Sequence, residues 1–123
     1  FSIKDFVINI NPDQEKLLNK KWPGPYTFLF TYNKNLPSHL MNDTGKIAIR
    51  VSNHLPIKQL LEDYKGYMVS TSANFSGKPN INCPKKILKT FANDDMAYYD
   101  EPLGNQSKPS QIIDLETGII IRE

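Results

Sequence analysis

The sequence has 123 residues, a usual length for one domain with its own core. With 39% apolar and 23% charged residues, its composition excludes a disordered chain. The net charge of +2 is far from the basic excess of a dedicated nucleic-acid binder. No apolar run reaches the roughly 18 residues that a membrane helix needs, and the single cysteine cannot form an internal disulfide. We therefore expect one cytoplasmic domain over residues 1–123, without a membrane partner.

The first predicted elements are a helix, a stiff connector and a strand. Asn11 can cap a helix that begins at Pro12 and continues to about residue 20, because proline is favoured at the first helical position. Trp22-Pro23-Gly24-Pro25 cannot continue this helix, since two prolines fix the backbone and remove amide donors. Residues 26–32 place aromatic side chains at every second position, which indicates a strand with one packed face.

The middle of the sequence predicts a loop, a strand, a helix and a second strand. Residues 33–45 are polar and contain proline, so they predict a long loop with room for one helical turn. Residues 46–51 carry apolar side chains at the period of a strand. Residues 56–64 carry them at helical spacing, and Gly66 can close that helix. A short strand is then expected over 67–70.

The remaining elements complete an α/β pattern. A second amphipathic helix is predicted over 84–91 and a strand over 96–99. Residues 111–115 and 119–122 flank a short turn with Gly118 where a positive φ is expected, which indicates a β-hairpin. Strands that alternate with helices before a terminal hairpin favour an α/β fold with a twisted, open, mixed sheet and flanking helices.

A cluster of hydroxyls follows the predicted strand at 67–70. The stretch VSTSANFSG, residues 69–77, holds four hydroxyls and one amide, with no acid, base or metal ligand. In open α/β sheets ligands bind beyond the carboxyl ends of strands, and such groups can hydrogen-bond an anion or a nucleotide. The same residue types are also the commonest in turns, so a capped turn that binds nothing is the alternative.

Four segments of the sequence, taken together, resemble one family. VSTSANFSGKP is similar to the STSAN-x-SG motif of the YrdC-like family, the threonylcarbamoyl-AMP synthases. Three other segments resemble its W-P-G-P-x-T, V-R-x-x-x-H and P-S-T-I-x-D motifs, in the same order and over almost the whole chain: residues 21–27, residues 47–54 and residues 108–114. The resemblance implies a YrdC-like fold.

The resemblance also implies an activity and its substrates. Family members make threonylcarbamoyl-AMP and pyrophosphate from L-threonine, bicarbonate and ATP, with Mg²⁺ expected on the triphosphate. The product feeds the modification of an adenosine in tRNA. Because threonine carbamate is already a carboxylate nucleophile, attack on the α-phosphate needs alignment and charge neutralisation more than proton transfer. A loop of hydroxyls and amides suits that chemistry.

By this resemblance, catalytic roles fall on two residues of the loop. Ser72 and Asn74 match the family's S-x-N pair, which acts together with a K-x-R pair. Ser70, Thr71 and Ser76 flank them and are expected either to contact phosphate or to brace the loop.

Three further residues match positions that line the substrate cleft of the family. Thr27 ends the P-x-T match, Arg50 stands where a strand-end arginine approaches the nucleotide, and Ser110 matches the serine of P-S-T-I-x-D. Gln111 replaces the usual threonine of that motif. As alternatives, Thr27 is a plain strand residue and Arg50 bridges loop carbonyls.

The two histidines give no comparable indication of a catalytic or metal-binding role. His39 and His54 have no ligand spacing around them, so no metal site is predicted. His54 matches the family's V-R-x-x-x-H segment, with a plain role in leading the chain out of its strand as the alternative.

The family's K-x-R pair has no counterpart in this sequence. We therefore expect the chain to correspond to the C-terminal two-thirds of a synthase, N-terminally incomplete, and to be inactive or nearly so by itself. Two other interpretations stay open. One is a non-catalytic RNA-binding module of the same fold, which would bind RNA directly, although the lysines are spread along the chain. The other is a carbamoyltransferase domain that forms a carbamoyl adenylate.

Overall fold

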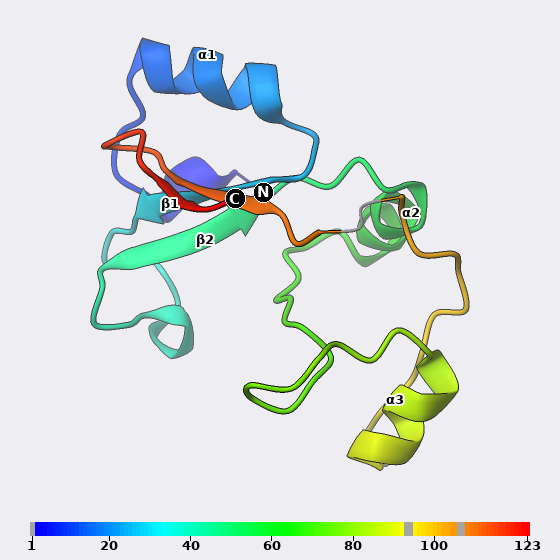
Figure 1. Cartoon of the computed structure of the whole chain (residues 1–123). Helices are drawn as coiled ribbons and strands as arrows, with labels where there is room; N and C mark the ends of the chain where they lie inside the picture. The colour runs from blue at the N-terminus through cyan, green and yellow to red at the C-terminus, as the bar shows by residue number, and fades with distance from the viewer. Residues whose placement is uncertain (1, 93–94, 106–107) are drawn as a thin grey trace.

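A four-stranded mixed sheet is the centre of the structure (Figure 1). The computed structural model describes residues 2–92, 95–105 and 108–123. The strand order is β2-β1-β3-β4. β1 (Tyr26–Thr31) pairs antiparallel with β2 (Lys46–Arg50) and parallel with β3 (Gln111–Asp114), which pairs antiparallel with β4 (Ile120–Arg122). This arrangement confirms the predicted open mixed sheet.

Helix α1 (Pro12–Lys21) covers one face of this sheet (Figure 1). It begins as predicted, because the side chains of Asn11 and Gln14 each accept a hydrogen bond from the other residue's backbone amide, both at 2.9 Å. Leu18 is buried on its inner side, next to the aromatic side chains of β1.

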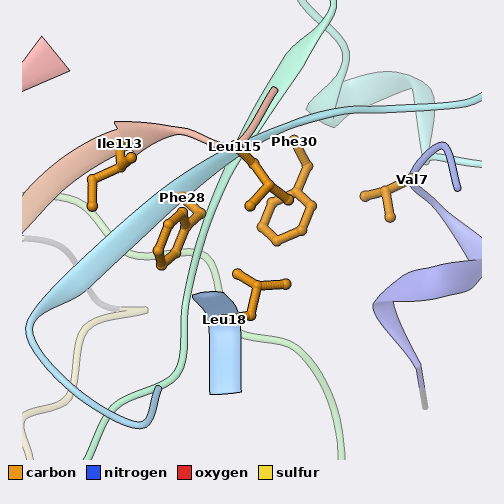
Figure 2. Close-up of a cluster of buried hydrophobic side chains, with 6 residues drawn as sticks. All are labelled: Val7, Leu18, Phe28, Phe30, Ile113 and Leu115. Atoms are coloured by element: carbon orange, nitrogen blue, oxygen red, sulfur yellow. The ribbon is translucent and has the colours of Figure 1, made fainter. Parts of the chain in front are cut away.

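The hydrophobic core lies between α1, the sheet and the segment before α1. Figure 2 shows its six buried side chains, which come from all three: Val7, Leu18, Phe28, Phe30, Ile113 and Leu115. Burial of each large apolar side chain stabilises the fold by about 1.5–3 kcal/mol. The alternate aromatic side chains of β1 therefore pack into the core, as its sequence pattern predicts.

The loop before β2 and the helix after β2 form close to their predicted positions. The loop before β2 contains one short 3₁₀ turn (Ser38–Leu40), in agreement with the prediction. Helix α2 (Leu55–Tyr64) ends at Lys65, which adopts the left-handed conformation with φ of 56°. The helix is therefore closed by Lys65, one residue before the predicted Gly66. Gly66 has another role, since a Cβ there would lie 2.8 Å from the Tyr64 ring.

The two predicted strands at 67–70 and 96–99 are absent from the structure of these residues. Both segments lie between β2 and β3 in the chain, 67–70 before helix α3 (Pro84–Phe91) and 96–99 after it, in the part that extends away from the sheet (Figure 1). A strand needs a neighbour for its backbone hydrogen bonds. Without one, the segment around Val69 leaves that side chain 78% exposed.

The predicted hairpin of β3 and β4 forms around a buried carboxylate. Asp114 accepts hydrogen bonds from the backbone amides of Glu116 and Thr117 at 3.0 and 3.1 Å, and Gly118 takes the expected positive φ of 73°. Lys46 of β2 donates to the other carboxylate oxygen of Asp114. The bond from Lys46 lowers the pKa of Asp114, with support from the two amides and against the opposing effect of burial.

The Asp114 carboxylate should make the stability of the fold depend on pH. Because the folded pKa of Asp114 is lowered, its contribution to the free energy of unfolding is complete above about pH 4, the usual pKa of a free aspartate. This contribution is lost as the pH falls through the lowered pKa. We expect Asp114→Asn to lower the free energy of unfolding at pH 7 by about 1–3 kcal/mol and to flatten its fall below pH 4. Urea unfolding across this range measures both effects.

Asp13→Asn is the matched control, because Asp13 forms only an exposed ion pair with Lys16. A variant at Asp114 with the stability and pH slope of the unsubstituted chain would contradict the role given to this carboxylate.

Candidate functional site

Two of the predicted site residues, Thr27 and Ser110, meet at one end of the sheet. Their Oγ atoms lie 2.7 Å apart, and both residues are partly buried. The parallel register of β1 and β3, which pairs Tyr26 with Gln111, places the starts of both strands side by side. Because a hydroxyl donates and accepts, each can bond a ligand while it bonds the other.

Arg50 joins this pair from the end of β2. It lies directly opposite Thr27 in the antiparallel register, so the two side chains share one face of the sheet. Phe28, next along β1, is buried toward α1, so Thr27 and Arg50 are on the opposite face. Arg50 is exposed, and within the described residues its guanidinium makes no hydrogen bond or ion pair. A guanidinium with free donors suits a phosphate or a carboxylate.

The other arginine of the chain, Arg122, holds the backbone of Ser110. Arg122 of β4 donates from Nε and Nη2 to the carbonyl of Ser110, at 3.2 and 2.8 Å. This is the bridging role that the sequence offered as an alternative for Arg50. The sequence did not assign Arg122 a role, and its only indication was the scarcity of arginine in the chain.

The connector before β1 fastens the same end of the sheet. Gly24 donates to the carbonyl of Val51 just after β2, at 2.8 Å, and the carbonyl of Pro25 accepts from the amide of Gln111 at 3.1 Å. A Cβ on Gly24 would lie 2.7 Å from the carbonyl oxygen of Lys21, so this close turn requires glycine. The W-P-G-P segment thus bonds to the ends of both neighbours of β1.

In the hydroxyl loop, Asn74 is the residue that braces the backbone. Its Nδ2 donates to the carbonyls of Phe75 and Lys78, both at 3.0 Å, and its backbone amide donates to Ser72 at 3.1 Å. Its Oδ1 is buried and has no hydrogen-bond partner in the described part of the chain. Asn74 therefore keeps one acceptor unused inside the loop.

The hydroxyls of the loop are not used for bracing. The side chains of Ser70, Thr71, Ser72 and Ser76 make no hydrogen bond within residues 2–92, 95–105 and 108–123, and all four residues are exposed. A turn capped by its own hydroxyls would show them bonded to nearby backbone. The capped-turn alternative therefore accounts for Asn74 but not for these four residues.

The structure keeps the two groups of predicted site residues apart. Among the described residues, no hydrogen bond joins the loop at 70–76 to Thr27, Arg50 or Ser110. The loop does not follow a sheet strand, because 67–70 has no strand partner, so the argument from carboxyl ends is wrong for it. Thr27, Arg50 and Ser110, here called the Thr27 group, lie instead where β1 and β3 begin and β2 ends.

Neither a metal cage nor a membrane helix occurs in the part of the chain that the structure describes. No three or more His, Cys, Asp or Glu side chains are grouped there so that they could hold a metal ion. No helix of those residues combines the length and the apolar character that crossing a membrane demands.

Comparison with known proteins places the chain in a family. The profile of the Sua5/YciO/YrdC family, described as "Telomere recombination", matches residues 2–123. The chain therefore belongs to this family, and the sequence resemblance is confirmed.

Named relatives give the same family assignment. The chain is 37% identical over 113 residues to a threonylcarbamoyl-AMP synthase of Buchnera aphidicola subsp. Schizaphis graminum, with 92% of this chain and 59% of the relative covered. It is 34% identical over 119 residues to the synthase of Saccharophagus degradans, with 96% and 62% covered. The chain thus spans about 60% of the length of these relatives.

A solved structure shares the fold. The crystal structure of P. abyssi Sua5 complexed with L-threonine superposes with a TM-score of 0.79 at 24% identity, over 93% of this chain and 34% of that one. This match confirms the α/β fold with its open mixed sheet.

The bond between Thr27 and Ser110 can be tested by its coupling energy. In urea unfolding of Thr27→Val, Ser110→Ala and the double variant, we expect the two substitutions to be coupled by about 0.5–1.5 kcal/mol, because either one alone removes the same hydrogen bond. Thr31→Val combined with Ser110→Ala is the control, since Thr31 lies on the same strand and its hydroxyl makes no hydrogen bond within the described residues. Additive effects for the Thr27 pair would show that the bond is absent in solution.

Proposed function

We propose that this chain carries the S-x-N part of a threonylcarbamoyl-AMP synthase site, as one portion of a YrdC-like domain that acts in the cytoplasm. The observation that supports this most strongly is the set of unbonded polar groups at the family's motif positions. The Arg50 guanidinium and the loop hydroxyls are exposed and have no partner within the described residues, so a ligand can bind them without breaking existing bonds.

In the proposed reaction the amine of L-threonine first takes up bicarbonate to give a carbamate and water. A carbamate oxygen then attacks the α-phosphate of ATP. The new O–P bond forms while the bond to the β-phosphate breaks, and pyrophosphate leaves. No proton moves in this second step, so the protein has to align the two anions and offset their charge. Mg²⁺ takes part as a component of the Mg-ATP substrate.

Each group of residues has a role in this scheme. Arg50 offsets negative charge beside Thr27 and Ser110, whose hydroxyls orient the bound substrate. The hydroxyls of the loop, with Ser72 at the S-x-N position, donate to phosphate oxygens. Asn74, at the other S-x-N position, holds the loop in shape through its bonds to the carbonyls of Phe75 and Lys78. The adenylate then serves tRNA modification.

The proposed reaction requires the family's K-x-R pair. The purified chain of 123 residues should release no measurable pyrophosphate from ATP in the presence of L-threonine and bicarbonate. Addition of a polypeptide with the K-x-R segment of a related synthase should restore release. Activity of the chain by itself would contradict this requirement. RNA binding that falls with salt and does not respond to ATP or threonine would favour the RNA-binding interpretation instead.

Ser72 is the sharpest single position for a catalytic test. In the protein supplied with the K-x-R segment, we expect Ser72→Ala to lower threonine-dependent pyrophosphate release roughly 10- to 100-fold, because a hydrogen bond to a charged oxygen is worth about 1.5–3 kcal/mol. Ser38→Ala is the control, since Ser38 is also exposed and its hydroxyl has no partner in the described part of the chain. Equal rates for the two variants would remove Ser72 from the reaction.

A further inference from the structure

His54 contacts a distant segment of the chain. It follows β2 and stands directly before α2, and its Nε2 lies 3.0 Å from the carbonyl oxygen of Pro102. Since a carbonyl can only accept, Nε2 must carry the hydrogen, and the imidazole donates. His54 therefore does more than lead the chain out of its strand. It links the end of β2 to the returning connection, the described residues 95–105 that follow α3.

Gly104 gives the imidazole the space that this contact needs. A Cβ on Gly104 would lie 3.3 Å from Nδ1 of His54, which is tighter than ordinary van der Waals contact. The backbone of the returning connection therefore packs against the ring as well as accepting its hydrogen bond. Two features of one short segment, Pro102 and Gly104, fit the same side chain.

The returning connection makes few hydrogen bonds. Residues 96–105 form no helix or strand, and apart from the His54 bond they make no hydrogen bond to the rest of the described chain. Downstream, the same connection leads to Ser110, which is held by Thr27 and Arg122. Within the described residues, His54 thus provides the one hydrogen bond that joins this segment to another part of the chain.

We propose that His54 is a positioning residue, which anchors the Pro102–Gly104 segment so that Ser110 is held in place beside Thr27 and Arg50. The contacts bring residues on both sides of this connection to the same end of the sheet. Arg50 precedes His54 in the chain, His54 bonds Pro102, and Ser110 bonds Thr27, which pairs with Arg50. The consequence for substrate binding rests on the proposed function, whereas the anchoring does not.

Hydrogen–deuterium exchange of the full chain tests the anchoring without any ligand. We expect His54→Ala to speed exchange about 3- to 10-fold in a peptide that covers residues 108–114, whose β3 amides are protected by hydrogen bonds to β1 and its connector, the factor that loss of one hydrogen bond allows. Exchange in α1 should not change, because no hydrogen bond joins α1 to residues 95–105 in the part of the chain that the structure describes. His54→Gln should restore slow exchange, since its amide can donate to the same carbonyl. His39→Ala is the control, because His39 is exposed and its side chain is unbonded within the described residues.

Affinity for ATP and L-threonine, measured by calorimetry on the same proteins in the presence of the K-x-R segment, tests the link to the site. We expect His54→Ala to weaken binding by a similar factor and His54→Gln to restore it. Unchanged exchange in His54→Ala, or no rescue by glutamine, would overturn the anchoring. Faster exchange with unchanged affinity would overturn the positioning role. If the unsubstituted protein binds neither ligand, the proposed function fails, and the exchange experiment still decides whether His54 anchors this segment.

Discussion

β1 is paired along both edges, and the position of the candidate site follows from these pairings. Its antiparallel neighbour β2 ends where β1 begins, and its parallel neighbour β3 begins there as well. Arg50, Thr27 and Ser110 therefore come from three separate parts of the chain to one end of the sheet. The register sets which residues face one another, because a shift of one residue would turn each side chain to the other face. Burial of Phe28 against α1 fixes that register.

Packing differs strongly between the two groups of candidate site residues. The Thr27 group stands on strands that share the hydrophobic core, and the connector and Arg122 bond to the same end of the sheet. The hydroxyl loop lies on a segment with few such contacts, where Val69 is 78% and Phe75 58% exposed. The chain spans about 60% of the length of related synthases. We infer that a complete site would include both the loop and the residues Thr27, Arg50 and Ser110.

Local sequence signals predicted most of the fold. The predictions failed for features that depend on contacts with residues distant in the sequence. Asn11 and Gly118 act through their own neighbours in the chain, so their cap and turn could be inferred from sequence. Residues 67–70 look like a strand, but a strand also needs a neighbour, which pattern alone does not supply. For the same reason, the contacts of Arg122 with Ser110 and of His54 with Pro102 join residues far apart in sequence and became visible only in the structure.

The most direct test of a single site is whether one ligand binds to both groups of candidate residues. Amide chemical shifts of the full chain can be followed by NMR during a joint titration with ATP and L-threonine, in the presence of the K-x-R segment. We predict that amides of Thr27, Arg50 and Ser110 and those of residues 70–76 shift together, along one binding curve. Shifts confined to one group, or absent from both, would contradict the claim that they form a single site.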